Sequence, residues 1–260
     1  MTEYTTPTLS LADRVVVLTG GTRGIGRALA DGIAAAGATL VVLARDEEKL
    51  RELETELTAG GAAVATHAVD LADTEAVAHT IQQVAEVHGR IDGLVNNAGI
   101  TKVGPTMDYA IEDARRILDV NVLGLLACSQ AAAREMGPGG SIVNVASLSS
   151  FIGQPERTAY VGSKSAVIGM TKSMAVEWGP LGIRVNAIAP GYIETDLSRA
   201  LMAKDPEYRG LVENRTPLRR FGRPEDLVGA VLFLLGDHAA FVSGAHLSVD
   251  GGWLANGFMR

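Results

Sequence analysis

Short apolar runs rich in β-branched residues alternate along this chain with longer helical patterns. The first run, RVVVLTG, ends in glycine, and runs of the same kind recur along the chain. They occupy 14–20, 39–44, 62–70, 91–99, 140–147, 183–191 and 245–252. Apolar runs of this length are typical of strands in a buried parallel sheet. Because helical stretches separate them, the pattern predicts an α/β fold with a doubly wound, mostly parallel sheet flanked by helices on both faces.

The helical patterns fill the spaces between these runs. The first helix is expected from Gly24 to Ala36 with Gly37 at its C-terminal cap, and the second begins at Asp46. The remaining helices are predicted from Asp73, over 108–136, over 158–178 and from about Pro224. The segment 194–222 is expected to be irregular or short-helical, and we interpret it as a lid over the substrate.

No change in composition divides the chain of 260 residues. We therefore expect a flexible tail over 1–10 and a single domain over 11–260. The net charge of −7 and the lack of a dense basic run argue against a nucleic-acid partner. Cys128, the single cysteine, is interpreted as a small buried residue in a reducing cytoplasm. The histidines lack metal-ligand spacing, and no apolar run is judged long enough to span a membrane.

A glycine-rich sequence, TGGTRGIG, joins the first strand to the first helix. Gly20, Gly24 and Gly26 stand at a turn where backbone N–H groups of a helix N-terminus can bind a pyrophosphate. A side chain would block that approach. Tight turns between a strand and a helix also need glycine for steric reasons, so the pattern alone does not decide.

Tyr160 and Lys164 lie four positions apart among small residues, so on a helix they share one face. Taken alone, they are a core tyrosine beside a lysine that extends to solvent. Ser147 and Asn97, however, each follow a predicted strand, and the carboxyl ends of parallel strands line one crevice. These side chains are therefore expected to meet.

The glycine spacing resembles that of the short-chain dehydrogenase/reductase family. The motif NNAG at 96–99, Asn121 in DVNVLG, Ser147, and the Tyr160–Lys164 pair match family motifs in the same order, as do PGYIET at 190–195 and the later VDGGW. The resemblance implies a Rossmann-like single domain. It also implies a nicotinamide-dependent oxidoreductase that interconverts a secondary alcohol and a ketone. The alternative is a non-catalytic dinucleotide-binding sensor or scaffold on the same fold.

The resemblance assigns the catalytic roles. Tyr160 is the general acid or base, and Lys164 lowers its pKa and holds the nicotinamide ribose. Ser147 hydrogen-bonds the reacting oxygen, and Asn121 supports a proton relay to Lys164. A shift of the tyrosine pKa to neutrality needs ~4 kcal/mol, which one ammonium at ~4 Å supplies at an effective dielectric near ~20. The alternatives are a strand-end cap for Ser147 and a locally satisfied amide for Asn121.

Residues for the cofactor and the substrate follow from the same matches. Asp70 resembles a residue near the adenine, although it could equally cap the next helix. The cofactor residues are Gly20, Thr22, Arg23, Gly24, Ile25, Gly26, Arg45, Asp70, Leu71, Asn97, Ala98, Gly99, Tyr160, Lys164, Pro190, Gly191, Ile193 and Thr195. The substrate residues are Ser147, Leu148, Ser149, Gln154, Tyr160, Tyr192 and Leu197. The substrate is a small molecule of unidentified class: a sugar, a cyclic diketone, an acyl β-ketone or a bulky hydroxy compound.

NADP(H) is favoured over NAD(H) because the second strand ends in Ala44, where an NAD enzyme would have an acid. Arg45 can bind a 2′-phosphate, and Arg23 can approach from the glycine loop. Arg45 could instead be an ordinary solvated charge, and an arginine at the position of Arg23 also occurs in some NAD-type loops. Asp46 is interpreted as the cap of the second helix.

Apolar residues on more than one face of the helices at 108–136 and 158–178 indicate a partner chain. The residues concerned are Leu123, Leu125, Leu126, Met170 and Met174. The family resemblance implies a homotetramer completed by the final helix and strand.

Overall fold

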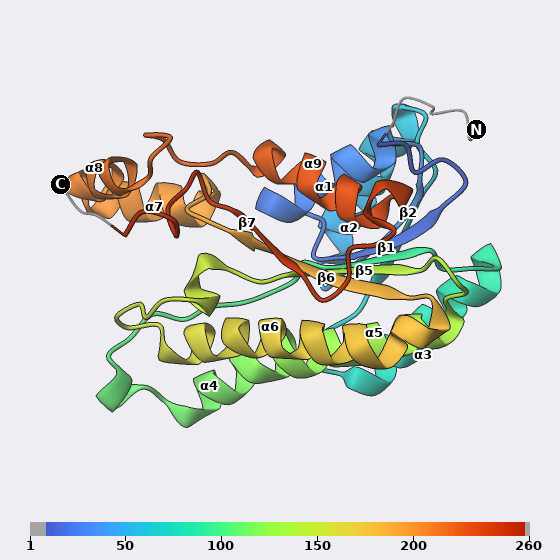
Figure 1. Ribbon diagram of the computed structural model, residues 1–260, viewed down its shortest axis with the longest axis horizontal. Coiled ribbons are helices and arrows are strands. Elements are labelled where there is room, and N and C mark those ends of the chain that lie inside the picture. Colours follow the sequence, from blue (N-terminus) through green and yellow to red (C-terminus); the bar gives the residue numbers. More distant parts are fainter. Residues whose placement is uncertain (1–8, 258–260) are drawn as a thin grey trace.

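A seven-stranded, all-parallel sheet forms the centre of the computed structural model, which describes residues 9–257 (Figure 1). The strand order is β3-β2-β1-β4-β5-β6-β7. The strands are β1 (Val15–Thr19), β2 (Thr39–Ala44), β3 (Val64–Ala68), β4 (Gly93–Asn96), β5 (Ser141–Val145), β6 (Arg184–Pro190) and β7 (His246–Val249). Each strand lies within its predicted range, and the predicted doubly wound fold is confirmed. The predicted tail falls mostly on residues 1–8, which lie outside the described part.

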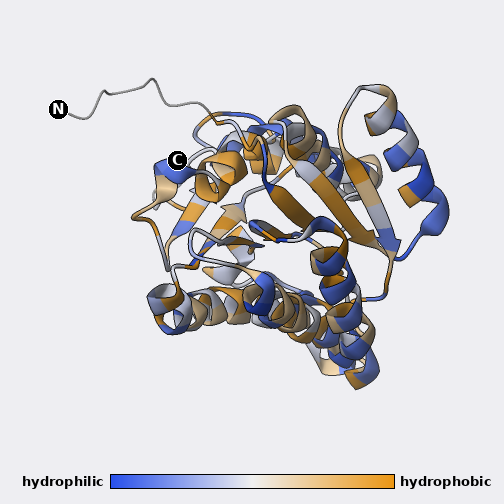
Figure 2. Ribbon diagram, turned by 90° about the vertical axis from the view of Figure 1, so that its right-hand side faces the viewer, coloured by the Kyte–Doolittle hydropathy of each residue, from blue (hydrophilic) through white to orange (hydrophobic). Residues whose placement is uncertain are grey.

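Helices cover both faces of the sheet (Figure 1). One face carries α1 (Gly24–Ala35), α2 (Glu47–Ala59) and α9 (Val228–Leu235). The other carries α3 (Thr74–His88), α4 (Ile111–Leu118), α5 (Leu125–Glu135) and α6 (Thr158–Trp178). Figure 2 shows that the strands between these layers are predominantly hydrophobic. Each face thus encloses its own core, with Leu29 and Val231 in one and Ile81 and Val167 in the other.

Helix ends follow the predicted caps closely. Gly37, just beyond α1, has a left-handed φ of 90°. The carboxylates of Asp46 and Asp73 accept hydrogen bonds from the first turns of α2 and α3. Pro224 opens a 3₁₀ turn that leads into α9. The predicted lid contains two short helices, α7 (Asp196–Lys204) and α8 (Pro206–Arg215).

The long helix predicted over 108–136 starts later and is not uniform. A separate 3₁₀ turn covers Thr106–Asp108, and α4 begins at Ile111. Between α4 and α5 the chain is π-helical over Asp119–Gly124, which the sequence did not indicate. The whole stretch, Ile111–Glu135, is long and apolar enough to cross a membrane, contrary to the prediction of no such run. Half of its most apolar window is buried inside the protein, as in the core helix of a soluble protein.

The prediction of a partner-facing surface is wrong for two residues. Leu125 and Met174 are buried in the core beneath their helices, and Cys128 is buried beside them as predicted. Leu123 remains 48% exposed. Leu126 and Met170 are partly buried against the core. The apolar surplus on these helices is therefore smaller than the sequence suggested.

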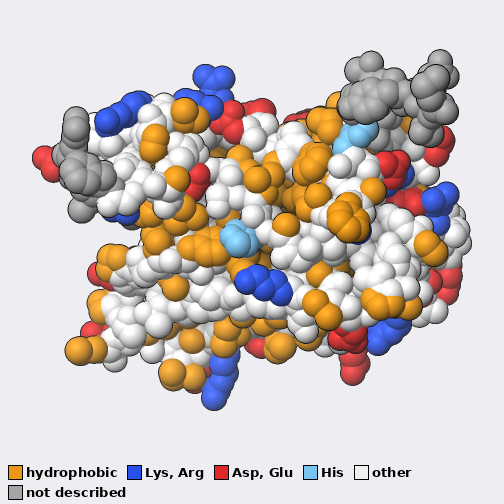
Figure 3. All heavy atoms as spheres, viewed as in Figure 1, with side chains coloured by type: hydrophobic (Ala, Val, Ile, Leu, Met, Phe, Trp, Pro, Cys, Tyr) orange, Lys and Arg blue, Asp and Glu red, His pale blue; other side chains and the backbone are white. Residues whose placement is uncertain are grey.

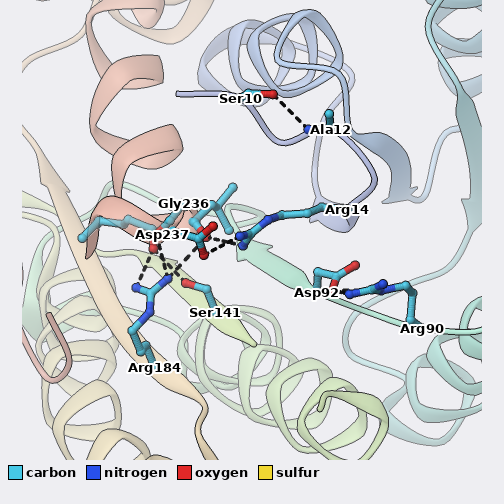
Figure 4. A network of polar contacts seen from close by, with 11 residues as sticks. Ser10, Ala12, Arg14, Arg90, Asp92, Ser141, Arg184, Gly236 and Asp237 are labelled. Carbon is cyan, nitrogen blue, oxygen red and sulfur yellow. Dashed lines mark hydrogen bonds and ion pairs between the residues drawn. The ribbon is translucent and has the colours of Figure 1, made fainter. Parts of the chain in front are cut away.

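Polar contacts bind the amino ends of the strands to the neighbouring helix (Figure 4). The Arg184 guanidinium donates to the carbonyl oxygens of Leu234 at 2.7 Å and Gly236 at 3.1 Å, so it satisfies the C-terminus of α9. Arg14 forms an ion pair with Asp237. These contacts fix the amino ends of β1 and β6 to α9, at the end of the sheet opposite the carboxyl ends of the strands.

Candidate active site

The predicted site residues follow the carboxyl ends of the strands. Asn97 follows β4, Ser147 follows β5, and Gly191 follows β6. Parallel registers align these ends, with Thr19 beside Asn96 and Pro190 beside Val249. Figure 3 shows a hollow at this end, between the part that carries α7 and α8 and the part beneath it. The convergence expected from the sequence is present.

The glycine loop leads into a helix whose N-terminus is uncapped. A Cβ on Gly26 would lie 1.8 Å from the Gly20 carbonyl oxygen, so this glycine is required by packing. The N-terminus of α1 has no side-chain cap and no acidic residue in its first turn, whereas α2 and α3 are capped by aspartates. Its first N–H groups therefore remain available to an anion. The steric interpretation of the loop is thus confirmed, and phosphate binding by the loop stays a prediction.

The NNAG turn is joined to the glycine loop and to the predicted catalytic residues. The Asn97 side-chain amide donates to the carbonyl oxygens of Thr19 at 3.1 Å and Gly20 at 2.8 Å. A Cβ on Gly99 would lie 3.3 Å from Asn121 Oδ1 and 3.5 Å from Lys164 Nζ. The turn therefore supports the glycine loop and also borders the predicted catalytic residues.

Arg23 and Arg45 are exposed, and neither forms an ion pair with another residue in the described part of the chain. Asp46 accepts a hydrogen bond from Lys49 N and pairs with Lys49 Nζ at 2.9 Å, so it is committed to its own helix. The end of β2 therefore carries Ala44 and Arg45, and the next acid, Asp46, is engaged by Lys49.

Asp70 does not cap the following helix; Asp73 does. The Asp70 carboxylate instead accepts hydrogen bonds from Ala72 N at 3.1 Å and Arg116 at 2.6 Å. Partial burial tends to raise the pKa of Asp70, but these bonds and the charge of Arg45 hold it below its ordinary value. Leu71, which follows it, is buried against Gly124.

Tyr160 and Lys164 lie near each other at the start of α6. Lys164 Nζ is 6.0 Å from the centre of the Tyr160 ring and donates to the Val145 carbonyl oxygen at 2.6 Å. Burial lowers the pKa of Lys164 to about 8. Burial also raises the pKa of Tyr160, although a hydrogen bond with Ser147 and the charge of Arg157 oppose this rise.

Lys164 was expected to lower the pKa of Tyr160, and the structure differs from that expectation. The ammonium is held by Val145, and the tyrosine pKa lies above its ordinary value. The phenol is therefore protonated at neutral pH in this structure.

Four predicted substrate residues form one hydrogen-bonded chain. Ser147 donates to Ser149 at 3.1 Å, Ser149 to Gln154 at 3.0 Å, and Gln154 to the Tyr192 hydroxyl at 3.3 Å. The Ser147 hydroxyl also accepts a hydrogen bond from Ser149 N. Ser147 therefore caps the turn after β5, which was its alternative role. Leu148 is only 2% exposed and offers a substrate little surface. The side chain of Leu197 lies outside the described part.

Asn121 is buried within the π-helical turn. Its side-chain amide exchanges hydrogen bonds with the backbone of Ile100, at 2.8 and 2.9 Å, and donates to Ser163 Oγ at 3.0 Å. Ser163 in turn donates to the Tyr160 carbonyl oxygen at 2.7 Å. The locally satisfied amide considered as an alternative is therefore wrong, because Asn121 joins three segments. Ser163 was not among the predicted site residues, although its place three residues after Tyr160 was a signal.

The segment after β6 approaches the glycine loop. Gly191 donates to Val249 O at 3.0 Å, and its missing Cβ would lie 2.7 Å from Asp250 Cα. Ile193 is buried, and the Thr195 methyl would lie 3.5 Å from a Cβ on Gly24. A cavity of about 370 Å³ lies there, lined in part by Gly24, Thr195 and Arg223. Aromatic rings of Tyr192, Tyr208, Phe221 and Trp253 pack α8 onto this segment.

Among the described residues, no group of three or more histidine, cysteine or acidic side chains could hold a metal ion.

Comparisons with known proteins identify the family of the chain. The family model described as enoyl-(acyl carrier protein) reductase matches residues 20–254. The chain belongs to the short-chain dehydrogenase/reductase family. Gluconate 5-dehydrogenase of Gluconobacter oxydans is 38% identical over 94% of this chain and 95% of its own length. The 3α-hydroxysteroid dehydrogenase of Mediterraneibacter gnavus is 41% identical over 94% of this chain and 98% of its length.

A solved structure is equally similar. The gluconate 5-dehydrogenase of Burkholderia cenocepacia, in complex with NADP and tartrate, has a TM-score of 0.91 and 37% identity, covering 95% of this chain and 97% of that one. This short-chain dehydrogenase/reductase is thus an NAD(P)-dependent alcohol dehydrogenase or ketoreductase that acts on CH–OH groups of small molecules. The alternative of a non-catalytic dinucleotide-binding protein is not favoured.

Proposed function

We propose that the protein interconverts a secondary alcohol and a ketone with NADP(H), and that Tyr160 is its acid or base. The observation that supports this most is the placement of Tyr160 beside the buried ammonium of Lys164, whose Nζ lies 6.0 Å from the centre of the tyrosine ring, with Ser147 acting on the pKa of the same phenol. A serine and a tyrosine so placed can both hydrogen-bond a single substrate oxygen. The free N-terminus of α1 supports binding of the cofactor pyrophosphate.

A bound nicotinamide ring supplies or accepts the hydride at the substrate carbon. During ketone reduction, the protonated Tyr160 donates its proton to the substrate oxygen, and Ser147 stabilises the charge that develops there. During alcohol oxidation the same phenol must act as a base. The Lys164 ammonium favours that state if it turns from Val145 toward the cofactor ribose. Asn121 holds the Ile100 and Ser163 segments around this pair.

The reaction is tested by following nicotinamide absorbance with a panel of ketones and alcohols. Relatives named for gluconate direct the panel first to hydroxy acids and sugars, then to steroids and β-ketoacyl compounds. NADP(H)-dependent turnover of at least one compound is expected. Tight cofactor binding with no turnover across the panel would instead favour a non-catalytic role.

Preference for NADP(H) rests on Arg45, Arg23 and the lack of an outward-facing acid at Ala44. Replacing Arg45 with Ala is expected to lower kcat/KM with NADPH by about 10–100-fold, because a charged hydrogen bond to a phosphate is lost. The value with NADH should change little. Steady-state kinetics with both cofactors measures the ratio. An initial preference for NADH, or an unchanged ratio, would contradict the assignment.

We also propose a homotetramer in the cytoplasm. Leu123, in the π-helical turn before α5, and Val176, on α6, are exposed apolar residues, and the edge strand β7 exposes Leu247. Edge strands and apolar patches of this kind are commonly covered by a partner. Light scattering at micromolar concentration is expected to give about four times the chain mass. A monomer at that concentration would rule the assembly out.

The segment 194–222 is proposed to cover the substrate, because α8 packs on Tyr192 at the end of the hydrogen-bonded chain from Ser147.

A further inference from the structure

Gln154 links the predicted catalytic serine to Tyr192. Its Oε1 accepts a hydrogen bond from the Ser149 hydroxyl at 3.0 Å, and its Nε2 donates to the Tyr192 hydroxyl at 3.3 Å. The Ser149 hydroxyl in turn accepts from the Ser147 hydroxyl at 3.1 Å. Gln154 is partly buried, and Ser149 is 2% exposed. The four side chains therefore form one chain of hydrogen bonds in which each proton has a defined direction.

The count of protons along this chain decides what Ser147 can do. A hydroxyl has one proton to donate and two lone pairs that accept. Ser147 Oγ accepts from Ser149 N at 3.1 Å and gives its proton to the Ser149 hydroxyl. It therefore keeps one lone pair and has no proton for a substrate oxygen. The Ser149 hydroxyl cannot relieve it, because its own proton points to Gln154.

A half-turn of the Gln154 amide reverses the chain. The amide nitrogen then donates to Ser149, and the amide oxygen accepts from Tyr192, whose hydroxyl serves equally as a donor. Ser149 in turn gives its proton to Ser147, and both lone pairs of the Ser147 hydroxyl are occupied. The proton of Ser147 is then free for a substrate oxygen. The terminal torsion of a glutamine side chain is broad and two-fold, so both orientations of the amide are accessible.

The heavy atoms at both ends of the chain are held in place, so the change is confined to the protons and the amide. Ser150 N donates to the Ser147 carbonyl oxygen at 2.9 Å and closes the turn after β5. The Ser150 hydroxyl ties this turn to α6 by donating to the Lys164 carbonyl oxygen at 2.7 Å. At the other end, the Tyr192 ring packs on Trp253, with ring centres 5.8 Å apart.

We propose that Gln154 is a positioning residue whose amide orientation decides whether the Ser147 hydroxyl gives its proton to Ser149 or to the substrate oxygen. In the observed orientation, Ser147 can accept a hydrogen bond from an incoming hydroxyl group. In the reversed orientation, it donates to the oxygen on which negative charge develops. No covalent bond forms or breaks in this change. The inference rests on the proposed function, because it takes Ser147 as the residue that hydrogen-bonds the reacting oxygen.

The first test compares Gln154→Glu with Gln154→Met. A carboxylate of the same shape accepts at both oxygens, so it keeps the Ser149 proton and commits the Ser147 proton to Ser149. Methionine offers no such acceptor and releases Ser149. With the best ketone of the panel, Gln154→Glu should lower kcat by about 10–100-fold with little change in KM. Gln154→Met should keep at least about 5-fold more kcat than Gln154→Glu. A role in packing alone gives the opposite order, because glutamate preserves the shape of glutamine.

Two further measurements separate the direction of the proton from the effect of charge. A protonated carboxyl group has a proton to donate, so kcat of Gln154→Glu relative to wild type should rise as the pH falls from about 8 to about 5. In a Ser149→Ala background the chain is broken, and adding Gln154→Glu should cost less than about 3-fold. An undiminished loss there would mean that the carboxylate charge acts directly on the substrate oxygen, and it would overturn the inference.

Gln83→Glu is the matched control for the charge. It introduces the same carboxylate at an exposed position of α3 and should leave kcat unchanged.

Neutron diffraction from deuterated, cofactor-free crystals separates the inference from the proposed function, because it locates the deuterons of hydroxyl and amide groups without any reaction. The Ser147 deuteron should point to Ser149 in Gln154→Glu and away from it in Gln154→Met. The same direction in both variants, or a kcat of Gln154→Met no higher than that of Gln154→Glu, would overturn the inference. The expected directions, together with no turnover of any ketone, would overturn the proposed function and leave the assignment of the Ser147 proton standing.

Discussion

Tyr160→Phe is expected to reduce turnover by about 10²–10⁴-fold while NADPH still binds. The substitution removes the phenol hydroxyl and keeps the ring beside Lys164. The proton for the substrate oxygen must then come from water, without the positioning that the phenol provides. Single-turnover kinetics measures the chemical step, and fluorescence titration measures cofactor affinity.

Tyr109→Phe is the matched control for that substitution. The Tyr109 hydroxyl donates to the Lys102 carbonyl oxygen outside the proposed site, so its loss should leave turnover within about 2-fold of wild type. Near-normal single-turnover rates in Tyr160→Phe would show that another group transfers the proton.

Lys164→Met is expected to abolish most activity and yet stabilise the cofactor-free protein at pH 7. Burial lowers the Lys164 pKa from 10.5 to about 8, so the buried ammonium opposes folding below that pH. A difference of this size corresponds to ~3 kcal/mol, from which ~1 kcal/mol is subtracted for the lost hydrogen bond to Val145. The expected net gain in unfolding free energy is about 2 kcal/mol.

The pH dependence gives the sign of this effect. Between pH 8 and 10.5 the folded state has released the Lys164 proton and the unfolded state still binds it. The wild-type protein therefore gains stability relative to Lys164→Met as the pH rises through this window. Denaturant unfolding at pH 7 and pH 10, at one protein concentration, measures the difference.

Lys172→Met, which removes an exposed ammonium from the same helix, should change the unfolding free energy by less than about 0.5 kcal/mol at either pH. A destabilised Lys164→Met at pH 7 would mean that the ammonium contributes more through its hydrogen bond than burial takes away.

The strands, the glycine loop and the convergence of Ser147 with Tyr160 could be predicted because each depends on local pattern. Apolar runs identify the buried strands, and strand ends in a parallel sheet must share one edge. The cap at Asp46 follows from the same kind of local rule.

Other features depend on contacts between distant segments. The π-helical turn at Asn121 accompanies hydrogen bonds to Ile100 and Ser163, which no single stretch of sequence specifies. The direction of the Lys164 ammonium depends on the position of the Val145 carbonyl after the fold is complete. Leu125 and Met174 were assigned to a partner surface because the rotation of a helix about its axis cannot be fixed when apolar residues surround it.

Direct transfer of hydride to a carbonyl carbon is the central claim, and isotope transfer tests it most directly. NADPH carrying deuterium on the hydride-donating carbon of the nicotinamide ring is incubated with the enzyme and the best ketone from the panel, and the alcohol is examined by mass spectrometry and NMR. The account predicts one deuterium on the carbinol carbon, in one configuration, with its formation slowed in Tyr160→Phe. Alcohol without deuterium, or product formed equally fast by Tyr160→Phe, would contradict it.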